Sequence, residues 1–185
     1  MKAGRFEGPA KRRATRVLEQ NVELFRAAGY PETKSAGPLE ARLAGPGRVP
    51  LRLAMAQTGR VFGGNYALEV STADPVVEPS NGLTARGRGA VRLQGVAFRA
   101  RRGDATGRRL AQALEADRQL VERLTQVHFE AIRVEPDGRA VIRHMGGSVV
   151  WFLFPPLVTG IPLVSEQVRA TLAALEAFAR SRPPN

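Results

Sequence analysis

Apolar residues recur at helical spacing near both ends of the chain. One stripe comprises Val17, Asn21, Leu24, Phe25 and Ala28. These steps of three and four predict an amphipathic helix over residues 10–29, with Gly29 as its C-cap and Pro31 preventing its continuation. The second stripe comprises Val168, Leu172, Leu175 and Phe178. It predicts a closing helix with Ser165 as N-cap.

Between these helices the period changes to two. Apolar and polar residues alternate over 39–43 and 49–55, on either side of a Gly-Pro-Gly turn, which predicts a hairpin with one buried face. Pro50 suggests that its strand lies at an edge of the sheet, because proline donates no ladder hydrogen bond. Tyr66, Leu68 and Val70 predict a third strand after a Gly-Gly-Asn turn.

The middle of the chain mixes turns, strands and short helices. Residues 74–89 are rich in turn residues and predict a long surface loop. The next strand changes phase at Gly95, which predicts a β-bulge, with Val96, Phe98 and Ala100 pointing inward after it. Asp104 and Asp117 are predicted to cap two short helices. A hairpin follows, with a type I turn over residues 135–138.

This order predicts an α+β fold: a mainly antiparallel sheet with helices packed on one face, and with N- and C-terminal helices. Residues 10–180 are predicted to form a single domain, with residues 1–9 as a flexible arm and 181–185 as a tail. No apolar run is long enough to predict a transmembrane helix, and the charged N-terminus is not typical of a secretory signal.

The residues from Val96 to Phe178 resemble a layout of uncharacterised bacterial domain families of unknown function. The resemblance is carried by the strand VAFRARRGD, the leucines Leu110, Leu114, Leu120 and Leu124, the hairpin FEAIRVEPDGRAVIRH, the run FLFPPL and the closing helix. It implies a small α+β domain without a known catalytic site, and it assigns no functional residues.

Charge is concentrated in two segments. The net charge is +11, and 25 of the 28 basic residues are Arg. Residues 1–30 carry 7 basic and 3 acidic groups, residues 86–109 carry 8 and 1, and the rest of the chain is balanced. A uniform compositional bias toward arginine would not produce this distribution, so a basic patch for an anionic partner is predicted.

The predicted anion-binding residues lie in the second basic segment. They are Arg86, Arg88, Arg92, Arg99, Arg101, Arg102, Arg108 and Arg109. Such a stripe can follow a row of phosphates. The only aromatic residue among them, Phe98, is expected to point inward, so base stacking is not predicted. The alternative is a solvated strand face whose arginines pair with acids elsewhere.

His128, Glu130 and His144 are the candidate metal ligands. The chain has only two histidines, and a three-residue turn would place Glu130 opposite His144 on the neighbouring strand. Two histidines and a carboxylate are a ligand set for Fe(II). The alternative is a cross-strand ion pair at the edge of the core, where Ile132, Val134 and Ile142 share the face. The favoured prediction is that no metal is bound.

Trp151, Phe152 and Phe154 are the candidate apolar contact residues. In a loop near arginines they could enter an anionic bilayer surface or form a protein contact or a dimer seam. The favoured prediction is a buried strand that closes the core.

The remaining chemistry is sparse. The chain has no cysteine, no nucleophile elbow around Ser148 and no phosphate-binding glycine motif. We therefore expect a non-enzymatic binding or accessory protein without a cofactor or an identified small-molecule substrate. Its expected partner is nucleic acid or an anionic membrane or envelope component. A protein-interaction module or homodimer is the second class, and a metal-dependent enzyme the third. The expected location is the cytoplasm, either free or peripherally at the membrane.

Overall fold

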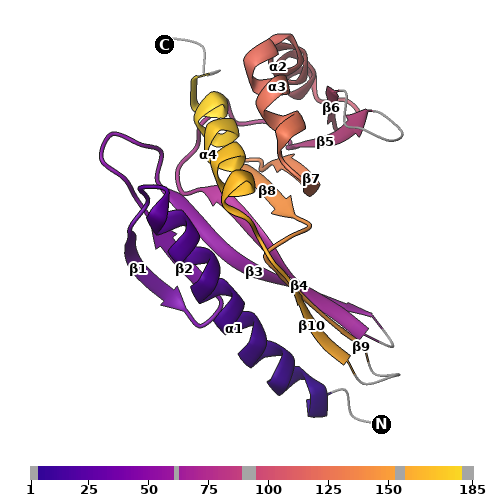
Figure 1. Cartoon of the computed structure of the whole chain (residues 1–185). Helices are drawn as coiled ribbons and strands as arrows, with labels where there is room; N and C mark the ends of the chain where they lie inside the picture. The colour runs from indigo at the N-terminus through magenta and orange to yellow at the C-terminus, as the bar shows by residue number, and fades with distance from the viewer. Residues whose placement is uncertain (1–3, 61–62, 89–94, 153–156, 181–185) are drawn as a thin grey trace.

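The computed structural model describes residues 4–60, 63–88, 95–152 and 157–180, and it confirms the α+β class (Figure 1). The helices are α1 Gly4–Ala27, α2 Ala105–Ala116, α3 Arg118–Gln126 and α4 Ser165–Arg180. The strands are β1 Glu32–Gly37, β2 Glu40–Leu43, β3 Leu51–Arg60, β4 Gly63–Thr72, β5 Leu83–Arg88, β6 Gly95–Ala100, β7 Phe129–Val134, β8 Ala140–His144, β9 Ser148–Phe152 and β10 Leu157–Ile161.

The strands form one antiparallel sheet in the order β1-β2-β3-β4-β8-β7-β5-β6, and β9 joins β4 to β10. Strand β4 is 10 residues long and has two neighbours on one side. Its residues 69–71 pair with β8, and its residues 63–66 pair with β9. The outer halves of β3 and β4, together with β9 and β10, therefore project beyond the rest of the sheet, and we call this part the sheet extension (Figure 1).

The helices of the described chain cover the same face of the sheet. Leu53, Val70 and Ile142 are cross-strand neighbours on this face, and each is buried. Phe178 of α4 packs edge-to-face on Phe98 of β6, with the ring centroids 6.0 Å apart. Cross-strand neighbours share a face, so this row identifies the covered side and leaves the opposite face of the sheet open.

Three local predictions are confirmed at element ends. The Asp104 carboxylate accepts a hydrogen bond from the Gly107 N–H at 2.8 Å, and Asp117 accepts from Leu120 at 3.0 Å. Each cap satisfies a backbone donor that the first helical turn leaves free. Gly138 ends the β7–β8 turn with φ +87°, the left-handed conformation that a glycine adopts without strain.

Helix α1 begins at Gly4, inside the segment predicted as an arm, and contains Pro9. An apolar stripe marks where a helix is buried and gives little information about polar turns that precede it, so the expected start at residue 10 was too late.

Strands β1, β5 and β10 were missed, and one proline was misplaced. Strand β5 lies inside the predicted loop, and its alternation is limited to the buried Leu83 and Ala85. Strand β1 has no apolar alternation and is positioned by pairing with β2. The edge prediction from Pro50 was wrong, because β3 lies between β2 and β4. Pro50 immediately precedes β3, and its carbonyl accepts a hydrogen bond from the Ala73 N–H. The predicted bulge depends on residues 91 and 93, which lie outside the described residues.

Candidate functional site: an arginine cluster on the open face

A row of mostly polar residues crosses the open face of the sheet. The backbone register places Arg42, Arg52, Ser71, Val141, Arg133, Thr84 and Arg99 opposite one another in succession, from β2 to β6. At about 4.8 Å for each strand step, the row is about 29 Å long. Four of its seven members are arginines, which makes it the most basic line across the sheet that this register defines.

The central arginines near this row are held by carboxylates. Arg52 donates to Glu40 at 2.6 Å. Arg133 binds both oxygens of Glu69 at 3.0 and 2.9 Å, and Arg143 from the adjacent row donates to the same carboxylate at 2.9 and 2.6 Å. The alternative of a strand face paired with acids is therefore correct for this central part of the sheet.

These ion pairs change the proton affinity of the carboxylates. Burial raises the pKa of Glu69, but the hydrogen bonds from Arg133 and Arg143 outweigh it and hold the pKa below its usual value. The hydrogen bond from Arg52 lowers the pKa of Glu40 in the same way. Both acids therefore remain ionised at neutral pH and neutralise the arginines around them.

The end of the row on β5 and β6 is different. Arg86, Arg99 and Arg101 are exposed, and we call these three residues the arginine cluster. Within the part of the chain that the structure describes, no hydrogen bond or ion pair engages any of their side chains. Their charges are therefore available to an external anion.

A shallow hollow of about 180 Å³ lies beside the cluster. Arg99 and Arg101 line it together with Thr84, Arg133 and Glu135. Glu135 is already bound by Arg133, so the hollow offers two unpaired guanidinium groups and a hydroxyl. Guanidinium groups bind phosphate oxygens in a bidentate manner, which makes an oxyanion the fitting ligand.

The other predicted arginines do not all join this surface. Arg108 and Arg109 are exposed on α2, on the side of that helix opposite its buried Leu110 and Leu114, and therefore point away from the sheet. Arg102 is exposed in the turn before α2. The side chain of Arg88, at the end of β5, and all of residue 92 lie outside the described part of the structure.

The three metal candidates are not brought together. A register shift between Phe129 and Ala131 sets His144 opposite Phe129, so the predicted pairing of Glu130 with His144 is wrong. Near Val134 the two strands pair in the predicted register. The irregularity at Glu130 then shifts the pairing by one residue, so that His144 does not lie opposite Glu130.

The two histidines occupy different environments. His144 is buried against α4, where its Nε2 lies 3.2 Å from the Thr171 hydroxyl, and burial lowers its pKa to about 4. His128 is exposed, and its Nδ1 lies 3.0 Å from Gln167 Nε2. Among the described residues, no group of three or more His, Asp or Glu side chains is arranged to hold a metal ion.

The apolar candidates are also separated. Trp151 is buried, with its ring against Gly64, so this residue belongs to the core. Phe152 is 47% exposed on the other side of β9. Residue 154 lies outside the described residues. No described helix is long and apolar enough to cross a bilayer.

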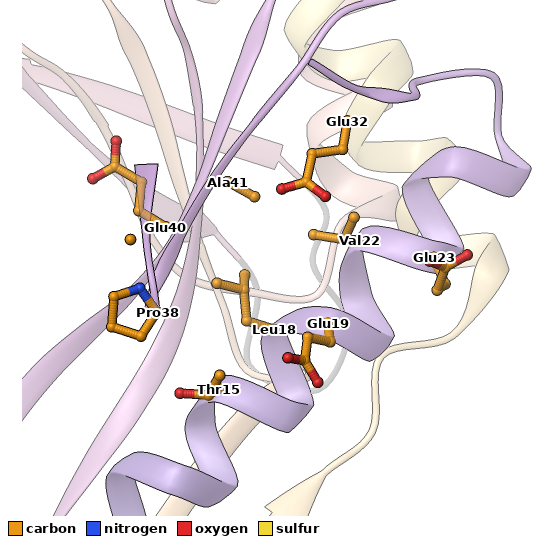
Figure 2. Close-up of a pocket in the computed structure, with 10 residues that line it drawn as sticks. Thr15, Leu18, Glu19, Val22, Glu23, Glu32, Pro38, Glu40 and Ala41 are labelled. Carbon is orange, nitrogen blue, oxygen red and sulfur yellow. The ribbon is translucent and has the colours of Figure 1, made fainter. Parts of the chain in front are cut away.

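A second hollow lies between α1 and the β1–β2 hairpin, with a volume of about 160 Å³ (Figure 2). Its floor contains Leu18 and Val22, and Glu19, Glu23 and Glu32 are among the residues around it. This surface is acidic and would repel an anion, so the basic and acidic surfaces are spatially separate.

Sequence reasoning missed Thr84 and Arg133 as neighbours of the cluster. Thr84 pairs directly with Arg99 between the consecutive strands β5 and β6, and Arg133 pairs with Thr84 from β7, which is distant in sequence. The relevant signal was the alternation around Leu83 and Ala85, which defines β5 and with it the register.

The chain belongs to a family described as a protein of unknown function, DUF3156, whose model matches residues 23–181. This confirms the resemblance to an uncharacterised domain family. No curated protein and no solved structure matches the chain.

Proposed function

We propose that this chain, as a member of that family, is a non-enzymatic accessory protein that binds the phosphate groups of an anionic partner through the arginine cluster. The observation that supports this most strongly is the contrast along one sheet face. Arginines on the central strands are paired with glutamates, whereas Arg86, Arg99 and Arg101 are exposed and have no ionic partner among the described residues.

The contrast is informative because the paired arginines already have a structural role. A guanidinium group held by a carboxylate stabilises the sheet and has little remaining capacity for a ligand. The three cluster arginines repel one another and contribute no such stabilisation. Their placement is favourable when phosphate oxygens occupy the space between them, since each phosphate neutralises charge and accepts bidentate hydrogen bonds.

The non-enzymatic part of the proposal is supported by the separation of the candidate ligands. His144 is buried behind the sheet, whereas His128 and Glu130 are exposed. The Thr171 hydroxyl lies beside His144 Nε2, but both side chains are buried and closed to a substrate, so binding is the activity that the geometry favours.

The test is binding of the purified protein to duplex DNA, single-stranded RNA and anionic vesicles, each at low and at moderate salt. We expect binding to at least one of them that weakens steeply with salt, because bound phosphates release counterions. Absence of binding to all three at low salt would refute the proposal and favour a protein-interaction module.

Net charge alone attracts any polyanion, so the control must remove the same charge elsewhere. Arg99→Gln with Arg101→Gln is compared with Arg118→Gln and Arg123→Gln, two exposed arginines of α3. Affinity is expected to fall about tenfold or more in the first double variant, because two guanidinium groups no longer bind phosphate oxygens, and clearly less in the second.

A further inference from the structure

The two hairpins of the sheet extension end at the same level. Gly63, the first residue of β4, pairs with Arg60 on one side and with Phe152 on the other, and Phe152 pairs in turn with Leu157. The far ends of β3, β4, β9 and β10 therefore meet in one place, which is visible as the tip of the molecule near the N-terminus (Figure 1).

Large apolar side chains are exposed at this tip. Phe152 is 47% exposed and its cross-strand neighbour Leu157 is 50% exposed, on the face opposite the buried Trp151. Ile161 continues the same side of β10 and is 42% exposed. Burying such side chains in an apolar medium is favourable, so this surface favours an apolar environment.

Helix α1 brings positive charge to the same level. The Asn21 side chain donates to the Gly147 carbonyl at 3.1 Å, just before β9 begins. From there to Phe152 is about 16 Å along the strand, and a helix covers about the same distance between Asn21 and Ala10. Figure 1 shows α1 running toward the tip in this direction. Lys11, Arg12 and Arg13 therefore lie at the same level along the sheet as the exposed apolar pair.

These three cations are exposed, and no described residue forms an ion pair with them. They lie on the helix-covered side of the sheet, whereas Phe152 and Leu157 point to the open side. The tip thus presents apolar groups on one side of the sheet and cations at the same level on the other side.

We propose that this tip, comprising Lys11, Arg12, Arg13, Phe152 and Leu157, docks on an anionic lipid bilayer. The apolar pair enters the interface between headgroups and acyl chains, and the cations contact lipid phosphates. The inference goes beyond the proposed function, because it uses residues outside the arginine cluster and identifies a membrane as the anionic surface.

The combination of charge and apolar exposure selects this partner. A nucleic acid would use the cations but would offer no apolar medium for Leu157. A bilayer accommodates both kinds of group at adjacent depths. Each cation near an anionic surface and each buried methylene contributes to binding, so the tip is expected to need both.

Trp151 is the only tryptophan of the chain and is adjacent to Phe152, so it reports on the tip in the unmodified protein. The protein is mixed with vesicles of phosphatidylcholine and phosphatidylglycerol in which the acyl chains are brominated or not. We expect bromine to quench Trp151 fluorescence when phosphatidylglycerol is present. Bound protein without quenching would overturn the inference.

Two variants and their matched controls complete the test. Phe152→Ser with Leu157→Ser is compared with Met145→Ser, an apolar residue that is 58% exposed outside the tip. Vesicle co-sedimentation is expected to weaken about tenfold or more in the tip variant, because two half-exposed apolar side chains lose their burial, and to change little in the control.

Lys11→Gln, Arg12→Gln and Arg13→Gln together are compared with the same change at Arg118, Arg123 and Arg169, which are exposed on α3 and α4. The tip variant is expected to lose selectivity for phosphatidylglycerol, and the control is expected to keep most of it. Equal losses in both variants would overturn the tip as the docking surface.

The two proposals fail in different ways. Binding to duplex DNA that depends on Arg99 and Arg101, without vesicle binding, overturns the membrane inference and leaves the proposed function standing. Vesicle binding that needs Phe152 and Leu157 but survives Arg99→Gln with Arg101→Gln supports the tip and overturns the arginine cluster.

Discussion

The burial of His144 makes folding stability depend on pH at values above those at which carboxylates titrate. The Thr171 hydroxyl donates its only hydrogen to the Gln167 carbonyl at 2.7 Å, so His144 Nε2 must donate to the hydroxyl oxygen. The proton of the neutral ring is therefore on Nε2, and Nδ1 is buried without a partner among the described residues. Adding a second proton would place an uncompensated charge in the core.

The magnitude follows from the pKa difference between the two states. Burial lowers the pKa of His144 from 6.5 to about 4. The unfolded chain thus binds a proton below about pH 6.5 that the folded chain does not accept until about pH 4. Stability is fully present above this window and falls as pH decreases through it, by about 2 kcal/mol between pH 7 and pH 5.

Urea unfolding at half-unit steps from pH 7 to pH 5 measures this loss. Glutamates and aspartates whose pKa is lowered in the folded state lose their contribution to folding stability mainly below about pH 4.5, outside this range. His144→Gln is expected to flatten the profile, whereas His128→Gln at the exposed histidine should leave it unchanged. Equal stability of the wild type at pH 7 and pH 5, or an unchanged slope in His144→Gln, would refute the reasoning.

Two further predictions concern the sheet. Glu69→Ala leaves the two arginines that it holds without their shared carboxylate, and urea unfolding should show a loss of about 1–3 kcal/mol, against less than about 0.5 kcal/mol for the exposed Glu130→Ala. A larger loss in Glu130→Ala would contradict the assignment. Gly64→Ala should cost about 1–3 kcal/mol, because its Cβ would lie 2.9 Å from the Trp151 ring. Its cross-strand partner Gly59, where a Cβ meets nothing within 4 Å, should tolerate alanine with little change; equal losses would contradict the described packing.

Local signals determined the parts of the fold that were predicted correctly. The caps Asp104 and Asp117 and the turn that ends at Gly138 depend on neighbouring residues only. The missed strands lack a clear pattern of their own: β1 has no apolar alternation and is held by pairing with the adjacent β2, and β5 is short and pairs with the distant β7. Pairing between strands far apart in the chain is what a single sequence reports least.

The same limit applies to the candidate site. Charge counts located Arg99 and Arg101, but no local pattern indicates that Arg52, Arg133 and Arg143 are neutralised by glutamates on other strands. The split of the predicted patch between the open face and α2 likewise required the topology. The tip depends in the same way on how α1 lies along β9, which the residues of α1 alone do not encode.

The most direct measurement compares two variants of equal net charge on the same anionic partner. The slope of log Kd against log salt concentration is measured for the wild type, for Arg99→Gln with Arg101→Gln, and for Arg118→Gln with Arg123→Gln. The account predicts a slope that is shallower by about one to two units in the first variant alone, because about one counterion is released for each phosphate that is neutralised. Identical slopes in both variants would contradict it, since binding would then follow net charge rather than the arginine cluster.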